Sequence, residues 1–151
     1  MIVFSPYSKQ LRTKKENPKN YPYWKELVDK LGKFNTIVQI GVKDEVVLVP
    51  ECRFNMPLKE ISAIINLCDF WVSVDNFLPH LANKLGKKGV VLWSISDPKI
   101  FGYKQNVNIL KDRSYLRERQ FEIWEQAEYN IDAFVSPTVV VERLKIEGLI
   151  K

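Results

Sequence analysis

The chain has 151 residues, of which 46% are apolar and 27% charged, and its formal net charge is +5. This length and balance predict a single globular domain over residues 1–151 and exclude a disordered or fibrous chain. No apolar run approaches the roughly 20 residues of a membrane span, and the N-terminus lacks the basic start and apolar core of a signal peptide, so we expect a cytoplasmic protein.

The first half of the chain alternates short apolar runs with segments of helical spacing. β-Branched and aromatic residues predict a strand over 2–5, and continuous apolar runs predict further strands over 35–41 and 45–49. Between the first two strands, apolar residues recur every three or four positions over 22–32, which is typical of a helix begun by proline and ended by glycine. A second helix, again with proline near its start, is predicted over 57–68.

The second half continues this alternation. The spacing predicts a strand over 69–74, a helix over 77–86 and a strand over 89–95. The tail predicts a helix over 117–130 and a last helix over 136–150, with serine as its cap and proline at its first position. Strands that alternate with helices predict an α/β fold, a doubly wound parallel sheet with helices on both faces.

Polar side chains follow two of the predicted strands. In open parallel sheets, ligands collect beyond the carboxyl ends of the strands, where helix N-termini converge. Asp75 and Asn76 can cap the next helix, whose first turn favours an anion and contains His80, the only histidine. We expect His80 to donate to a phosphate or sugar oxygen, although a plain cap at Asp75 and a packing role for His80 explain the same spacing. Ser94 and Ser96 form a weaker pattern of the same kind after the next strand.

The loop after the first strand, residues 8–21, carries much of the excess positive charge. It can reach the same edge of the sheet, where Lys19 and its neighbouring lysines would attract an anionic ligand. A solvated basic loop is an equal alternative. Basic and aromatic residues together also suit single-stranded nucleic acid, but one loop is a small platform, so we do not expect nucleic acid as the partner.

Several classes of site are excluded because their motifs are missing. The sequence has no G-x-G-x-x-G, P-loop, G-x-S-x-G or kinase pattern. Cys52 and Cys68 have the surroundings of core residues, and without a CxxC pair or a second histidine we expect no metal site and no cofactor. Nothing in the sequence places an activated serine near His80, so no catalytic residue is assigned.

Two segments share a recognisable pattern: KNYPYWKELVDKL, residues 19–31, and INLCDFWVSVDNFLPHLANKLGKKGVVLWSISDP, residues 65–98. The second follows the spacing D-S/T-G-x-x-H-L-A-x-x-x-G-K-P and then G-x-S/T-x-P. Its matching residues are Asp75, His80, Leu81, Ala82, Gly86, Lys87, Ser96 and Pro98, and those of the first segment are Lys19 and Pro22. This combination resembles glycosyltransferase family 9, the lipopolysaccharide heptosyltransferases, along nearly the whole chain.

The resemblance implies a Rossmann-like domain similar to the C-terminal, donor-binding half of a GT-B glycosyltransferase. Such a half holds a nucleotide-diphosphate sugar, and ADP-heptose is the usual donor of the family. By this analogy Lys19 meets phosphate. The diphosphate and sugar would be surrounded by Asp75, Asn76, Phe77 and His80, with the loop completed by Ser94 and Ser96.

This chain also departs from the family pattern. Asn76 and Phe77 stand where the family has a small Ser/Thr-Gly pair, and Ser94 replaces a loop glycine, so we expect the backbone to approach phosphate less closely. The family's N-terminal half, which binds the acceptor and carries the catalytic base, has no counterpart in these residues.

Two hypotheses follow from the resemblance and its departures. The first is a glycosyltransferase-type donor domain that works with a partner chain or a second copy of itself. The second is a non-catalytic protein that binds or sequesters a nucleotide or nucleotide sugar. A scaffold that binds no ligand is a third reading.

Overall fold

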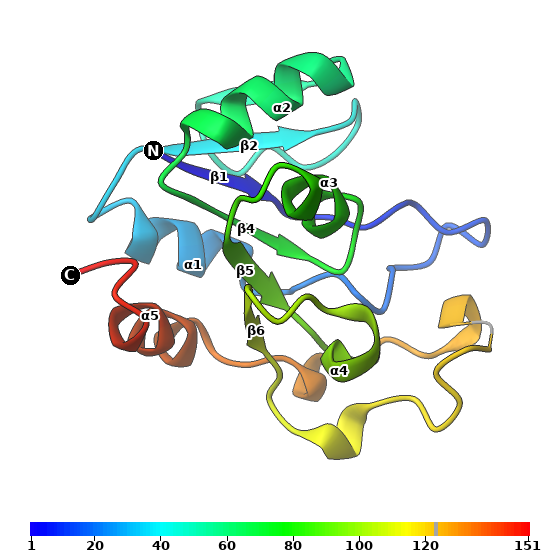
Figure 1. Cartoon of the computed structure of the whole chain (residues 1–151). Helices are drawn as coiled ribbons and strands as arrows, with labels where there is room; N and C mark the ends of the chain where they lie inside the picture. Colours follow the sequence, from blue (N-terminus) through cyan, green and yellow to red (C-terminus); the bar gives the residue numbers. More distant parts are fainter. Residues whose placement is uncertain (123) are drawn as a thin grey trace.

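Six parallel strands form the central sheet of the computed structural model, which describes residues 1–122 and 124–151. They are β1 (Ile2–Ser5), β2 (Ile37–Gly41), β3 (Cys52–Phe54), β4 (Phe70–Val74), β5 (Gly89–Leu92) and β6 (Val107–Ile109). Their order across the sheet is β3-β2-β1-β4-β5-β6, and every pair of neighbours is parallel. The carboxyl ends of the strands therefore meet at one edge of the sheet (Figure 1).

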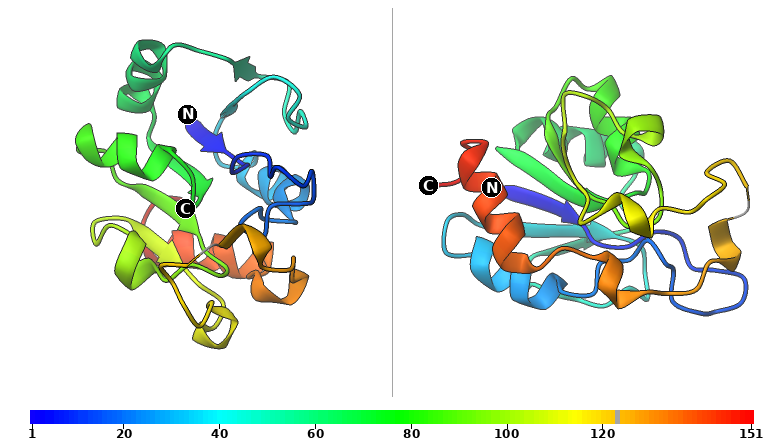
Figure 2. Two further views of the ribbon diagram at one scale, coloured as in Figure 1. Left: turned by 90° about the vertical axis from the view of Figure 1, so that its right-hand side faces the viewer. Right: turned by 90° about the horizontal axis from the view of Figure 1, so that it is seen from below.

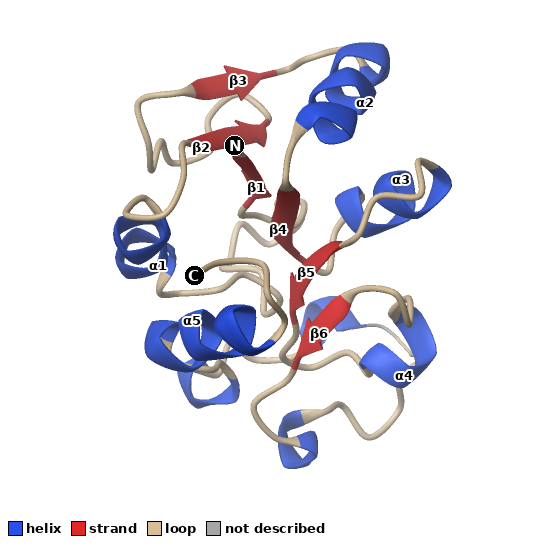
Figure 3. Cartoon of the chain, turned by 60° about the vertical axis from the view of Figure 1, so that its left-hand side comes forward, coloured by secondary structure: helices blue, strands red, loops and turns tan. Residues whose placement is uncertain are grey.

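Helices cover both faces of this sheet. They are α1 (Trp24–Leu31), α2 (Leu58–Leu67), α3 (Leu78–Lys84), α4 (Pro98–Phe101) and α5 (Pro137–Ile146). α1 and α5 pack together on one face, and α2 and α3 lie on the other (Figures 1 and 3). Within residues 1–122 and 124–151, no helix is long and apolar enough to cross a membrane. The predicted doubly wound α/β fold is confirmed.

β4 lies near the middle of the sheet, and all five of its residues are buried. The indole of Trp71 occupies the space beside Gly89 at the start of β5, where a Cβ atom would lie 2.0 Å from the ring. Trp71 Nε1 also donates a 3.0 Å hydrogen bond to the carbonyl of Lys87. Packing therefore requires a glycine at residue 89, and it fixes the two strands whose ends reach the candidate site.

Several predicted elements have shorter bounds than expected. The helices predicted over 22–32, 57–68 and 77–86 are present as α1, α2 and α3. α5 begins at Pro137, and the Ser136 hydroxyl accepts a 3.2 Å hydrogen bond from Val139 N, so the predicted cap is confirmed. α4 and β6 were not predicted, because four and three residues are too few to show a period.

The predicted strand over 45–49 is wrong: this stretch is a loop, and the third strand is β3. Val46 and Val47 are 63% and 60% exposed, so they supply no buried strand face. The buried Gln39 side chain holds the loop instead. Its Nε2 donates to Val46 O, and its Oε1 accepts from Leu48 N, both at 2.8 Å. The chain then returns to pair Cys52 with Gln39 in the sheet.

The predicted helix over 117–130 is also wrong where the structure describes it, and residue 123 lies outside the described residues. The described part of this stretch contains the 3-10 turn η2 (Trp124–Gln126). Two further 3-10 turns flank it in the connection between β6 and α5: η1 (Arg113–Tyr115) and η3 (Ile131–Ala133). The Arg117 guanidinium donates to two backbone carbonyls of its own segment at 2.7 Å, and the Gln120 side chain donates to the Arg117 carbonyl, also at 2.7 Å. These side chains bind the carbonyls in place of a helical ladder.

Candidate functional site

Two neighbouring cavities open at the edge of the sheet to which the strands point. The larger, of about 950 Å³, lies between the segments that follow β1 and β2 and the start of α3. The smaller, of about 350 Å³, lies between the β5–α4 connection and the segment after η1. Both cavities are lined by Lys19, Asp75, His80 and Trp124, which we call the shared wall. Of these four residues, the sequence predicts Lys19, Asp75 and His80 as site residues.

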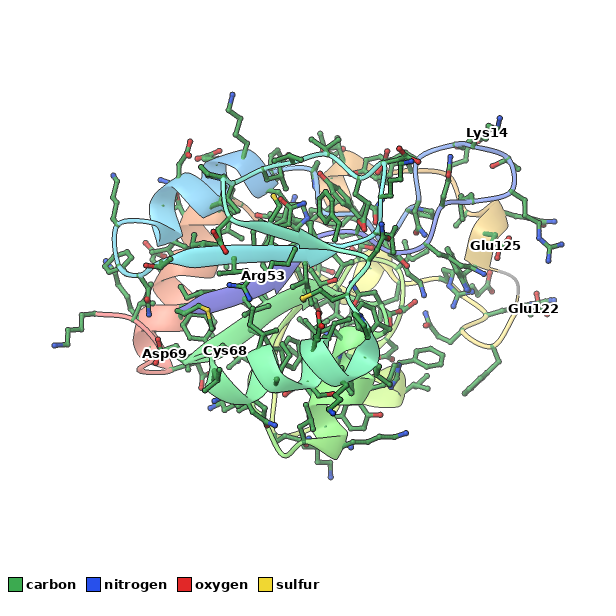
Figure 4. The ribbon with its side chains drawn as sticks, turned by 90° about the horizontal axis from the view of Figure 1, so that it is seen from above. Lys14, Arg53, Cys68, Asp69, Glu122 and Glu125 are labelled. Atoms are coloured by element: carbon green, nitrogen blue, oxygen red, sulfur yellow. The ribbon has the colours of Figure 1, made fainter. Side chains whose placement is uncertain are left out.

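Two segments far apart in the sequence meet at this edge (Figure 2). Lys9, which follows β1, forms a 2.9 Å ion pair with Glu125 of η2. Figure 4 places Lys14 and Glu125 at this end of the molecule and Asp69, which precedes β4, at the other end. The β6–α5 connection therefore closes one side of the cavities, next to the basic loop.

Lys19 and Asp75 form an ion pair within the shared wall. The Lys19 Nζ–Asp75 Oδ2 distance is 2.9 Å, and the two side chains are only 14% and 16% exposed. The ammonium also lies 4.1 Å from the centroid of the Trp124 ring, a cation–π distance. The Lys19 backbone N–H donates to the side chain of the buried Asn17 at 2.9 Å. Lys19 is thus held in place, whereas Lys14 has the exposure of a solvated loop residue.

Asn76 joins the carboxyl ends of β1 and β4. Its Nδ2 donates to Ser5 Oγ at 3.0 Å and to the carbonyls of Ser5 and Tyr7 at 3.2 Å. Its Oδ1 accepts a 2.9 Å hydrogen bond from Leu78 N at the start of α3. The N-cap position of α3 is Phe77, which makes no side-chain cap, so neither Asp75 nor Asn76 is the cap itself. Asn76 supplies the side-chain acceptor from the residue before it, and this leaves the carboxylate of Asp75 to Lys19.

Phe77 lines the larger cavity and is 45% exposed. Its backbone has φ −68° and ψ −29°, an ordinary right-handed conformation that any L residue adopts without strain. This chain therefore needs no glycine at residue 77 for its backbone. The side chain instead adds an aromatic surface to the cavity.

His80 is exposed on the first turn of α3 and lines both cavities. Its Nδ1 lies 2.8 Å from the Tyr103 hydroxyl, and the two rings meet edge to face with centroids 5.6 Å apart. This exposed position does not suit the alternative of a packing residue. It leaves the ring able to contact a ligand in either cavity.

The two predicted serines have different surroundings. Ser94 is buried, its hydroxyl donates to the Pro18 carbonyl at 3.0 Å, and it lines neither cavity. It fixes the residue before Lys19 rather than facing a ligand. Ser96 is buried as well, but it lines the smaller cavity beside Asp75 and His80.

The lining residues that were not predicted from the sequence include Trp124 in the shared wall, and Arg117 and Gln120 in the smaller cavity. Burial lowers the pKa of the Arg117 guanidinium, and the nearby Asp75 carboxylate partly offsets this shift. Arg117 nevertheless stays charged, because its ordinary pKa lies far above neutral. All three belong to the connection between β6 and α5, where the three-residue turn η2 is too short to show a period in the sequence.

The larger cavity carries charges of both signs. Its lining contains the lysines Lys9, Lys14, Lys15, Lys19 and Lys43 and the carboxylates Glu16, Asp44, Glu45 and Asp75. Burial raises the pKa of Glu45, and the hydrogen bond that it accepts from the backbone N–H of Val42 opposes this shift. No group of three His, Cys, Asp or Glu residues that could hold a metal ion is found in the described part of the chain.

Sequence comparison gives a family match. A family model described as glycosyltransferase family 9 (heptosyltransferase) matches residues 1–127, which include Lys19, Asp75, His80 and Trp124. No curated protein sequence matches the chain.

Two solved structures share the fold. The E. coli ADP-heptose lipopolysaccharide heptosyltransferase II superposes with a TM-score of 0.66 at 18% identity, over 96% of this chain and 45% of that one. The E. coli heptosyltransferase WaaC with ADP superposes with a TM-score of 0.64 at 17% identity, over 97% and 44%. The chain thus spans less than half the length of either enzyme, and at these identities the likeness shows the fold alone.

Proposed function

The chain belongs to glycosyltransferase family 9, the heptosyltransferases, and on this basis we propose that it binds a nucleotide-diphosphate sugar at the carboxyl ends of β1 and β4. One observation carries the proposal: the half-buried Lys19, with Asp75 and His80, stands where two cavities meet. The whole chain, residues 1–151, would act as one donor-binding domain in the cytoplasm. An ADP-heptose-like donor is the first ligand to test, because similar enzymes are described with ADP-heptose and with ADP.

The two cavities suit the two ends of such a ligand. Volumes of about 950 and 350 Å³ compare with the roughly 300–1,000 Å³ of small-molecule sites. The larger cavity has apolar lining from Met56, Ile61 and Phe77, which fits a nucleoside. The smaller cavity has hydrogen-bonding groups from Ser96 and Gln120, which fit sugar hydroxyls. The diphosphate would then lie at the shared wall.

Lys19 is suited to hold the diphosphate without leaving Asp75. An ammonium has three donors, so it can keep its carboxylate partner and donate to phosphate oxygens as well. In a transfer reaction the leaving nucleotide diphosphate gains negative charge, and a cation held in place beforehand stabilises that charge. Lys19 and His80 would supply this stabilisation.

Transfer also needs a surface opposite the shared wall. An acceptor and a base must face the sugar at close range for reaction, since orientation supplies much of the rate. We propose that a partner chain or a second copy provides that surface. None of the site residues is assigned as the base.

A non-catalytic binding or sequestering protein is the second candidate. It is favoured by the two carboxylates that line the smaller cavity, which are both ion-paired: Asp75 with Lys19 at 2.9 Å, and Glu122 with Arg119 at 3.0 Å. A carboxylate oxygen that already accepts from a cation is less available to an acceptor hydroxyl. Such a site binds a sugar nucleotide without activating an acceptor.

Calorimetric titration with ADP and ADP-heptose tests the proposed site. Saturable binding is expected for the wild-type chain, and Lys19→Ala should weaken it about tenfold to a hundredfold, as the loss of a charged hydrogen bond predicts. Lys33→Ala is the matched control, because Lys33 is exposed beyond the opposite end of α1. Equal affinities for the wild type and Lys19→Ala would show that the ligand site lies elsewhere.

A further inference from the structure

The Tyr103 hydroxyl contacts His80 from outside the two cavities. His80 lines both of them and Tyr103 lines neither, while the hydroxyl lies 2.8 Å from Nδ1 of the imidazole. The ring therefore has one nitrogen bonded to Tyr103. The other nitrogen, Nε2, is the one left for a ligand.

Tyr103 belongs to a turn that is fixed by the core. Its carbonyl accepts hydrogen bonds from Asn106 N at 3.1 Å and from Asn108 Nδ2 at 3.0 Å. Asn108 Oδ1 in turn accepts from Trp93 Nε1 at 2.9 Å, and Trp93 is buried at the end of β5. At the preceding Gly102, a Cβ atom would lie 2.6 Å from a backbone oxygen of α4. The tyrosine is thus presented from a tightly packed turn.

The same turn makes a second polar contact with α3. Gln105 Nε2 donates to Asn83 Oδ1, one turn along the helix from His80. Two side chains of the turn therefore bind two side chains of α3, which holds the imidazole beside the hydroxyl.

We propose that Tyr103 is a positioning residue, whose hydroxyl donates to His80 Nδ1 and so keeps the proton of the neutral ring on Nε2, where it donates to an oxygen of the ligand's diphosphate. This inference rests on the proposed function. A neutral imidazole has one donor and one acceptor, and the hydrogen bond at one nitrogen decides the role of the other. With Nδ1 as the acceptor, the neutral ring still presents an N–H donor to an anion.

Tyr103→Phe removes this hydrogen bond and keeps the aromatic ring. The ring of the variant can still pack edge to face on His80, but no hydrogen bond keeps Nδ1 as the acceptor. The tautomer with a lone pair on Nε2 then becomes accessible, and that lone pair repels a phosphate oxygen. We expect ADP to bind about threefold to tenfold more weakly, as the loss of one hydrogen bond predicts.

Because the chain has one histidine, imidazole ¹⁵N NMR reports on His80 without ambiguity. The free wild-type chain is measured about two pH units above the ordinary histidine pKa of about 6.5. Nε2 should carry the proton and Nδ1 should show an accepted hydrogen bond. In Tyr103→Phe, the Nδ1 resonance should move toward that of a free lone pair.

The control for both measurements is Tyr115→Phe, the same chemical change at a tyrosine that lines neither cavity. It should leave the His80 resonances and the ADP affinity unchanged. A protonated Nδ1 in the neutral wild-type ring overturns the inference, and so does an ADP affinity in Tyr103→Phe equal to that of the wild type. If the wild-type chain binds no nucleotide, the proposed function fails and the role of Tyr103 in binding fails with it. The NMR experiment then shows separately whether Tyr103 sets the tautomer.

Discussion

Asp75 contacts Lys19 and also lines the smaller cavity, which we assign to the sugar. A bound diphosphate would lie near the same ammonium, so the carboxylate repels phosphate while it can accept hydrogen bonds from sugar hydroxyls. We expect Asp75→Asn to bind ADP severalfold more tightly and ADP-heptose more weakly. Calorimetric titration of both ligands gives the affinity for ADP-heptose relative to that for ADP. This ratio should fall about tenfold, because the hydrogen bonds to the sugar lose their charged acceptor.

The matched control for this prediction is Asp44→Asn, because Asp44 is exposed and lines only the larger cavity. It should change the affinities for both ligands by the same small factor. If Asp75→Asn also changes both ligands equally, Asp75 does not contact the sugar. Thermal unfolding is followed in parallel, since the variant leaves Lys19 without its carboxylate partner.

Sequence spacing indicated which candidate site residues lie near one edge of the sheet, but it did not give the directions of their side chains. Lys19, Asp75 and His80 meet as expected, because strand ends of a parallel sheet share one edge. The Ser94 hydroxyl donates a hydrogen bond to the Pro18 carbonyl, 76 positions away in the sequence. Trp124 reaches Lys19 from a segment with no period. Both depend on tertiary contacts that local patterns do not contain.

At the scale of elements, the Arg113–Asp97 ion pair connects η1 to the start of α4. Arg113 donates from Nη1 to Asp97 Oδ1 at 3.0 Å and from Nη2 to Oδ2 at 2.6 Å. Asp97 also accepts from Lys99 N at 2.9 Å and so caps α4. The hydrogen bonds from Arg113 hold the pKa of Asp97 below its usual value, although burial opposes this shift. The same loop carries Ser96, so the pair supports the smaller cavity.

The lowered pKa of Asp97 predicts the pH dependence of stability. The ionised carboxylate stabilises the folded chain above the ordinary aspartate pKa of about 3.9, and this contribution is lost as the pH falls through the depressed value. The difference in melting temperature between the wild type and Asp97→Asn should therefore be largest near neutral pH and shrink in acid. Asp29→Asn, an exposed change on α1, should show no such trend. A pH-independent difference would mean that the charge of Asp97 does not stabilise the fold.

The elements predicted correctly are those whose backbone is satisfied by its own helix or sheet. β4 and α5 follow from a buried apolar run and from a Ser-Pro cap. The wrong predictions fall where side chains bind the backbone instead, with Gln39 holding residues 45–49 and Arg117 holding the segment after η1. Whether such a side chain is within reach depends on the folded neighbours, so propensity alone misassigns these stretches.

At the scale of the whole molecule, the strand order explains the position of the candidate site. The alternation of strands and helices predicts a parallel sheet, but it does not give the order β3-β2-β1-β4-β5-β6. In this order the chain runs outward from β1 in one direction and from β4 in the other. Ligands bind at such a reversal in open α/β sheets. Lys19 and Asp75 follow β1 and β4, so their ion pair lies at the reversal.

If transfer needs a surface opposite the shared wall, as we propose, the behaviour of the chain with ADP-heptose should depend on a partner. A single copy should bind the donor and release no ADP, because one side of a cleft does not orient an acceptor and a base. In this assay water serves as the acceptor, so that each ADP released is matched by one free heptose. If a second copy supplies the opposite surface, ADP release per chain should rise with chain concentration, together with the dimer mass measured by sedimentation. If another protein supplies it, release should begin only when that protein is added, and Lys19→Ala should abolish it in either case. A sequestering protein would keep the donor intact under all these conditions.

One outcome would contradict the need for a partner: release of ADP at a concentration where sedimentation shows only single chains. It would place the catalytic base within residues 1–151.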